Sequence, residues 1–119
     1  ATAVAHGVPR GIHSDAPVTP LGPIFTAWCA VNRRTSSGRV LGANECISVE
    51  DALRAITLGA AFTLGLDDRI GSIEVRKFAD FCVLDDDPLA VDPEALKDLR
   101  VAGTVLGGQV LERPGSAAS

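Results

Sequence analysis

Hydrophobic residues at helical spacing dominate the middle of the chain. In residues 49–64 the apolar stripe consists of Val49, Leu53, Ile56, Ala60 and Leu64. Ser48 is a good N-cap, an acid three residues later approximates a capping box, and Gly65 can end the helix. The pattern therefore predicts one helix over residues 49–64. Small residues at 57–61 indicate close packing against another element.

Two further helices are predicted nearer the start of the chain. Residues 24–34 carry apolar side chains at helical spacing, namely Ile24, Phe25, Trp28 and Val31. The pair Arg33-Arg34 suits the C-terminal end of this helix, because the helix dipole favours positive charge there. The Ala-rich residues 1–6 indicate the end of a helix, with Gly7 at a position where glycine commonly stops one.

After Gly65 the pattern changes to short strands and turns. Residues 73–75, 79–84, 101–106 and 109–111 are predicted strands. Gly107-Gly108 is a two-residue hairpin signal between the last two strands. Pro93 after Asp92 predicts the first position of a short helix. The chain from about residue 66 onward is therefore expected to be β-rich, with a disordered tail at 113–119.

One segment has a different character. Residues 8–13 form a candidate strand that Arg10 and Gly11 interrupt, and the prolines at 17, 20 and 23 prevent any regular element from continuing. Because side chains alternate along a strand, His13 and Asp15 are expected on the same face. In α/β proteins, catalytic side chains often follow the end of a strand.

Two interpretations of Asp15 remain open from the local pattern. An Asp before a Pro-rich loop commonly closes a turn by hydrogen bonding its own backbone. The same carboxylate can instead act as a metal ligand or a general base. One carboxylate alone does not decide between these alternatives.

Composition excludes several classes of protein. The chain has 119 residues, is 46% hydrophobic and 22% charged, and carries a formal net charge of −4. Such values are typical of a soluble globular protein. No basic cluster exceeds Arg33-Arg34, so a nucleic-acid interface is not expected. The apolar run at 56–66 is too short to cross a bilayer, so no membrane partner is expected.

The cysteines and the start of the sequence add two expectations. Cys29, Cys46 and Cys82 are odd in number and widely spaced, which favours buried, reduced thiols in a cytoplasmic protein. The chain has no Met and begins without a helix cap. These features favour a fragment of a longer protein.

Several stretches together resemble one family. The run at 13–20 (HSDAPVTP) resembles the last barrel strand of the metal-dependent amidohydrolase superfamily, in its amidohydrolase-3 type, which includes the N-substituted formamide deformylases. The runs at 28–34 (WCAVNRR) and 47–55 (ISVEDALRA) resemble the helices that follow that strand. Four later features resemble the family's C-terminal segment: 71–74 (GSIE), Lys77, 79–80 (AD) and 83–84 (VL).

The resemblance implies a fold and a reaction. The expected fold is α/β: residues 1–65 would be the last strand and helices of a (β/α)8 barrel, and residues 66–112 part of a small β-sandwich. The expected parent hydrolyses the C–N bond of a small amide or formamide with a divalent metal, zinc being the expected one, and can be a homo-oligomer. Asp15 would be both metal ligand and general base, with Ala16 and Pro17 near the substrate. His13 would either support the site from behind or pack in the barrel interior, or else contact the metal or the substrate directly.

The resemblance also has gaps. The family's histidine ligands and its bridging lysine or carboxylate have no counterpart in this chain, so the chain alone is expected to be inactive. Arg76 stands where family members usually have Gly, which puts the geometry of that turn in question. Two rival interpretations are a non-catalytic interaction domain that pairs through its strand edges, and a small metal-binding regulator using His6, His13 and Asp15.

Other polar residues have simpler interpretations. The run Asp85-Asp86-Asp87 precedes Pro88 and is expected to be a solvated turn rather than a metal cluster. Asp80 is expected to close a strand pair, while Glu74 and Lys77 are expected in a surface turn. His6 is expected to face solvent.

Overall fold

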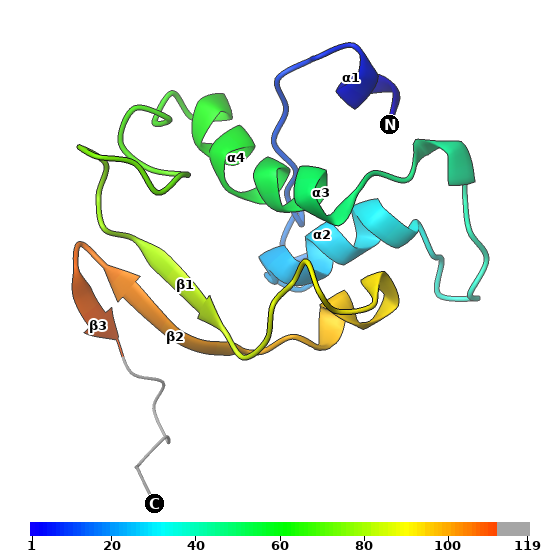
Figure 1. The fold of residues 1–119 in the computed structure, drawn as a ribbon. Helices are drawn as coiled ribbons and strands as arrows, with labels where there is room; N and C mark the ends of the chain where they lie inside the picture. The colour runs from blue at the N-terminus through cyan, green and yellow to red at the C-terminus, as the bar shows by residue number, and fades with distance from the viewer. Residues whose placement is uncertain (112–119) are drawn as a thin grey trace, which may run out of the picture.

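The computed structural model describes residues 1–111 as a group of short helices beside a small sheet (Figure 1). The helical elements are α1 (Thr2–Ala5), α2 (Pro23–Asn32), η1 (Ala43–Glu45), α3 (Val49–Ile56), α4 (Leu58–Thr63) and η2 (Pro93–Asp98). The strands are β1 (Phe81–Leu84), β2 (Val101–Leu106) and β3 (Gln109–Leu111). The predicted disordered tail, residues 113–119, lies outside the described residues.

The core lies where α2, α3 and η2 meet. Ala27, Ala52 and Leu96 are fully buried there, and Trp28 is nearly so. The Trp28 indole Nε1–H donates to the Glu94 carbonyl at 3.0 Å, so the apolar ring is buried while its one polar group is satisfied. The predicted helix at 24–34 is confirmed as α2, which ends when Arg33 adopts a left-handed φ of 48°. Trp28 thereby links segments far apart in the sequence.

The predicted helix over 49–64 is two helices, which corrects the sequence interpretation. The N-terminus is as expected: the Ser48 hydroxyl accepts from the Asp51 backbone N–H at 3.0 Å. The break falls at Thr57, whose φ and ψ are −115° and −95°. Its hydroxyl donates back to the Leu53 carbonyl at 2.8 Å, an alternative to regular helix bonding. Gly65, at a φ of 68°, follows the end of α4.

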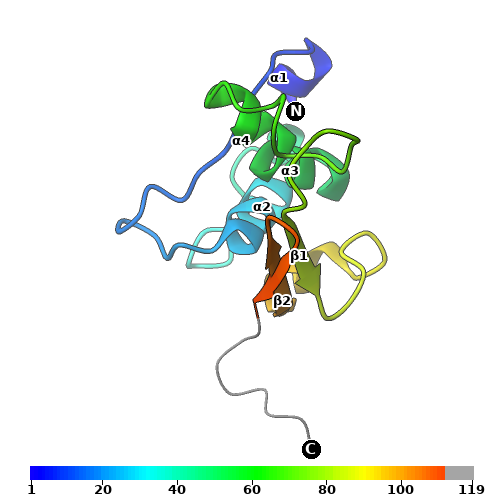
Figure 2. The ribbon, with the colours of Figure 1, turned by 90° about the vertical axis from the view of Figure 1, so that its left-hand side faces the viewer.

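The sheet is antiparallel with the order β1-β2-β3. The predicted Gly107-Gly108 hairpin is confirmed, with φ values of 56° and 81° that favour glycine. Asp80 closes this hairpin as expected, because its Oδ1 accepts from the Gly107 N–H at 2.7 Å. Figure 2 shows the sheet extending away from the helices, so most of its side chains are exposed.

The predicted strand at 73–75 is wrong. In the described part of the chain no strand pairs with it, and Ile73 and Val75 are 84% and 93% exposed. The segment instead turns at Arg76, which has a φ of 79°. Lys77 lies in this turn as expected, but its side chain is only 9% exposed and donates to the Ser72 hydroxyl at 2.6 Å. β-Branched residues favour strands only where a partner is available.

The remaining predictions of local structure have mixed outcomes. The acidic run at 85–87 is a turn: Asp87 Oδ1 accepts from the Leu89 N–H, and Asp85 Oδ1 from the Arg100 N–H, both at 2.9 Å.

Cys29 and Cys46 are half-buried, and burial raises the pKa of the Cys29 thiol. Cys82 is exposed, so the expectation of a buried thiol is wrong there. Within residues 1–111 no helix is long and apolar enough to cross a membrane.

Helix α1 is held by Glu45 of η1, which lies 43 residues after Thr2 in the sequence. The Glu45 carboxylate accepts from the Thr2 hydroxyl, from the Thr2 backbone N–H at 3.0 Å and from the Ala1 amino group at 2.9 Å. These hydrogen bonds, those from Thr2 foremost, lower the pKa of Glu45 from 4.5 to about 2. His6 at the end of α1 is exposed, as expected.

Acidification should therefore release α1. Because the folded-state pKa of Glu45 is depressed, its contribution is complete above pH 4.5 and is lost as pH falls toward about 2. We expect the Thr2 amide NMR shift to change between these values, and Glu45→Gln to abolish that titration. Glu50→Gln is the control. A Thr2 titration centred at 4.5 or above would contradict this account.

Replacing Arg76 by glycine should stabilise the protein. A non-glycine residue at a φ of 79° costs on the order of 1 kcal/mol, and glycine removes that cost. We expect Arg76→Gly to raise the free energy of unfolding by about 1 kcal/mol in urea denaturation. Arg39→Gly, at a position without positive φ, should lower it. Destabilisation by Arg76→Gly would show that the Arg76 side chain matters more than its backbone.

Candidate functional site

The candidate site lies in the loop that connects α1 to α2. Residues 8–13 do not form the predicted strand: within the described residues no strand lies beside them, and Ile12 makes one backbone bond to α3, from its N–H to the Ala55 carbonyl at 3.3 Å. A strand needs a neighbouring strand with which its backbone forms hydrogen bonds. Here the element beside residues 8–13 is a helix. The segment is nevertheless held, and it leads directly into Asp15.

Asp15 begins a tight turn. Its φ is 53°, in the left-handed region, and its carbonyl accepts from the Val18 N–H at 2.8 Å. Ala16 and Pro17 form the middle of this turn, are exposed, and are joined by a cis peptide bond. The Asp15 carboxylate is exposed. A non-glycine residue in this conformation costs on the order of 1 kcal/mol, so the surrounding contacts must offset that cost.

His13 lies against the backbone of Asp15. Its Nδ1 accepts a hydrogen bond from the Asp15 N–H at 3.1 Å. The Ser14 carbonyl, on the other side of the same peptide group, accepts from the Thr19 hydroxyl. The structure thus places the His13 ring against the Asp15 backbone, but not as the predicted neighbour on one face of a strand, because residues 8–13 form no strand. The role of Thr19 was missed, because a loop threonine carries no periodic signal.

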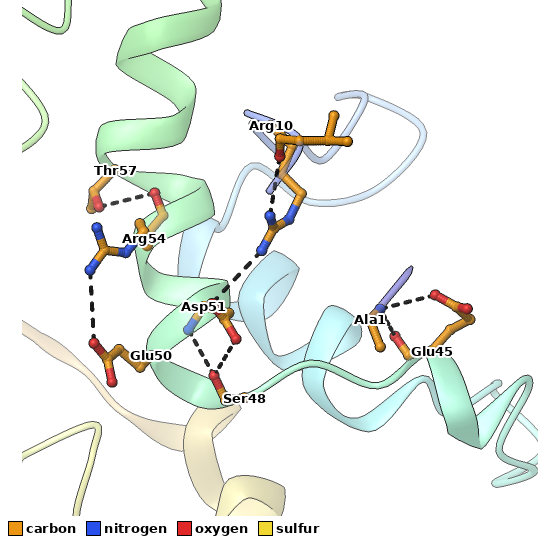
Figure 3. A network of polar contacts seen from close by, with 9 residues as sticks. Ala1, Arg10, Glu45, Ser48, Glu50, Asp51, Arg54 and Thr57 are labelled. Carbon is orange, nitrogen blue, oxygen red and sulfur yellow. Dashed lines mark hydrogen bonds and ion pairs between the residues drawn. The ribbon is translucent and has the colours of Figure 1, made fainter. Parts of the chain in front are cut away.

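Glycines allow the segment before Asp15 to lie directly on α4. A Cβ added at Gly59 would lie 2.0 Å from the Arg10 carbonyl oxygen, and one at Gly11 would lie 3.0 Å from Ala60 Cα. The Arg10 side chain also reaches Asp51 on α3, at 3.9 Å (Figure 3). The small residues of α4, predicted to mark close packing, therefore provide the surface on which the loop rests.

A hollow of about 180 Å³ adjoins His13 and Ser14. Its other lining residues are mainly apolar: Ile12, Leu21, Pro23, Thr26 and Ile56. The hollow places apolar surface next to the loop that carries Asp15. The arrangement is that of an exposed carboxylate with a fixed backbone, beside a partly apolar recess.

These residues do not by themselves fit a resident metal ion. Among residues 1–111 no group of three or more His, Cys, Asp or Glu side chains could hold one. The Nδ1 atom of His13 is already engaged by a backbone N–H. Catalytic zinc normally takes three protein ligands, and this loop offers one free carboxylate. The regulator built from His6, His13 and Asp15 is therefore wrong for the described chain.

Comparison with known proteins gives a consistent result. A model of the amidohydrolase family matches residues 1–111. The protein named as amidohydrolase YtcJ of Bacillus subtilis is 34% identical over 113 residues, covering 92% of this chain and 21% of its own. The N-substituted formamide deformylase of Arthrobacter pascens is 36% identical over 111 residues, covering 92% of this chain and 20% of its own.

A solved structure gives the same result for the fold. The crystal structure of an amidohydrolase from Thermotoga maritima matches with a TM-score of 0.68 and 28% identity, over 92% of this chain and 24% of that one. The chain is therefore an α/β unit similar to part of an amidohydrolase, with a small antiparallel sheet. It spans about a fifth of the length of the curated relatives that it matches.

The contact between Gly59 and Arg10 gives a direct test. In a free helix Gly→Ala is stabilising by roughly 0.5–1 kcal/mol, but here the new methyl group would overlap the Arg10 carbonyl. We expect Gly59→Ala to lower the free energy of unfolding by about 1–3 kcal/mol and to shift the amide resonances of residues 10–15. Gly103→Ala, with open space at its Cβ, is the control. Unchanged stability for Gly59→Ala would contradict the close approach.

Proposed function

The chain belongs to the amidohydrolase family, and from this membership we propose that it is the C-terminal part of a metal-dependent hydrolase. The proposed reaction is hydrolysis of the C–N bond of a small amide or formamide. The name of the relative from Arthrobacter pascens, an N-substituted formamide deformylase, supports this substrate class. The cytoplasmic location expected from the sequence stays a prediction.

The observation that carries the proposal is the exposed Asp15 carboxylate on a backbone fixed from both sides. We propose that Asp15 accepts a proton from the attacking water and passes it to the departing nitrogen, as a positioned carboxylate can do. The neighbouring Ala16 and Pro17 would border the substrate, together with His13. The same carboxylate is the proposed metal ligand of this chain.

The metal requires residues beyond those described. A divalent ion, with zinc as the expected one, would lower the pKa of bound water toward neutrality. Because residues 1–111 offer no set of three ligands, the other ligands would come from additional barrel strands. In this proposal residues 1–65 complete a (β/α)8 barrel and residues 66–112 belong to an adjoining β-sandwich. The chain alone would be inactive.

A second candidate function is a non-catalytic interaction domain. The exposed apolar residues before the sheet, Ile73 and Val75, favour it, as does the edge of β1 that no strand within residues 1–111 covers. In this case the chain would associate with itself or with a partner strand. A monomer at high protein concentration in sedimentation would count strongly against this candidate.

The test of the first proposal compares this chain with a version extended toward the N-terminus through the proposed barrel. We expect the extended protein to hold about one or two zinc ions and to hydrolyse an N-substituted formamide, and the 119-residue chain to do neither. Asp15→Ala should lower kcat at least about 100-fold in the extended protein.

Asp67→Ala, which removes another carboxylate, is the matched control and should retain activity. Metal-dependent hydrolysis by the 119-residue chain would overturn the proposed inactivity of the chain alone. Full activity in Asp15→Ala would overturn the role of Asp15. An extended protein with neither metal nor activity would leave only the family fold.

A further inference from the structure

We propose that His13 and Thr19 form a clamp on the Ser14–Asp15 peptide group, and that this clamp positions the Asp15 carboxylate. The inference rests on the function proposed for Asp15, because it concerns how that side chain is held. His13 and Thr19 are therefore positioning residues, which act through Asp15.

The clamp engages both polar atoms of one peptide group. The Asp15 N–H donates to His13 Nδ1 at 3.1 Å, and the Ser14 carbonyl accepts from the Thr19 hydroxyl. The two side chains approach this peptide from opposite ends of the loop. A peptide group held at its N–H and at its C=O has a defined orientation relative to the rest of the loop.

The orientation of that peptide sets the direction of the Asp15 Cα–Cβ bond, from which the carboxylate projects. The φ angle of Asp15 describes rotation between this peptide and the Cα–Cβ bond, and its value of 53° is unusual for a non-glycine residue. The bond from the Val18 N–H to the Asp15 carbonyl, at 2.8 Å, holds the following peptide as well. With both flanking peptides held, Asp15 is kept in a conformation that a free loop would populate little.

The hydrogen bond also assigns the tautomer of His13. An acceptor nitrogen has a lone pair and no proton, so the imidazole proton resides on Nε2. This distinguishes the clamp from a role in which His13 acts only through substrate contact. The essential atom for the clamp is Nδ1, whereas a purely substrate-binding ring would use Nε2, the free donor.

Two amide substitutions at position 13 distinguish a function of the His13 Nδ1 atom from a function of its Nε2 atom. In His13→Asn the side-chain oxygen lies near the position of Nδ1 and can still accept from the Asp15 N–H. In His13→Gln the oxygen lies near the position of Nε2 and cannot. At Thr19, Ser keeps the hydroxyl donor and Val removes it. Because His13 and Thr19 are both exposed, these changes leave the core around Trp28 intact.

The test is NMR on the 119-residue chain at about pH 8. We expect a scalar coupling across the hydrogen bond between the Asp15 nitrogen and His13 Nδ1. We expect residual dipolar couplings of Asp15 to match the wild type in His13→Asn and Thr19→Ser, and to change in His13→Gln and Thr19→Val. An unchanged Trp28 indole signal controls for folding.

Two results would overturn the clamp. One is the absence of a scalar coupling between the Asp15 nitrogen and His13 Nδ1, combined with residual dipolar couplings of Asp15 that are the same in every variant. The other is an equal change in His13→Asn and His13→Gln, which would show that the ring is needed for its shape and not for Nδ1. Neither result depends on whether the extended protein is active.

The extended protein links the clamp to the reaction. There we expect His13→Gln to lower kcat roughly two- to tenfold with little change in KM, and His13→Asn to restore most of the rate. Equal kcat values in the two variants would overturn the positioning role. If the wild-type extended protein is itself inactive, the proposed function fails, and the NMR experiment alone decides whether the clamp exists.

Discussion

The close approach of the Arg10 carbonyl to Gly59 is the constraint on which the rest of this structure depends. With no side chain at Gly59, the segment that precedes Asp15 lies directly on α4, and Gly11 fits against Ala60 in the same way. The break at Thr57 separates α4 from α3, so that one helix carries this contact while the other packs in the core. The position of the loop is thus determined by backbone contacts.

The candidate site illustrates how the backbone that carries an exposed loop carboxylate can be held by hydrogen bonds without burial. Asp15 is exposed, yet the peptide groups on both sides of it are hydrogen-bonded. Such preorganisation supports a role in which a carboxylate receives and returns a proton, because a mobile side chain would lose much of its effect. The same chain lacks a set of metal ligands among its described residues, so the proposed metal chemistry would need further ligands from the rest of the proposed parent.

Sequence patterns predicted the elements whose signals are local. Ser48 as a cap, Gly107-Gly108 as a hairpin and the apolar face around Trp28 all behaved as expected. The failures at residues 8–13 and 73–75 share a cause, since a strand needs a neighbour that no local pattern specifies. Within the site, the argument that placed His13 and Asp15 on one face relied on a strand that is absent, and their contact is instead a bond from the Asp15 N–H to the His13 ring. The contribution of Thr19 was not predictable, because it depends on how the loop folds back.

The measurement that tests the central claim most directly is zinc-edge anomalous diffraction from crystals of the extended protein. The account predicts an anomalous peak about 2.0–2.2 Å from a carboxylate oxygen of Asp15, the distance expected for a zinc–carboxylate bond. A well-occupied zinc site with Asp15 pointing elsewhere would contradict the role assigned to this residue. The family fold would then be shared while the chemistry is carried by other side chains.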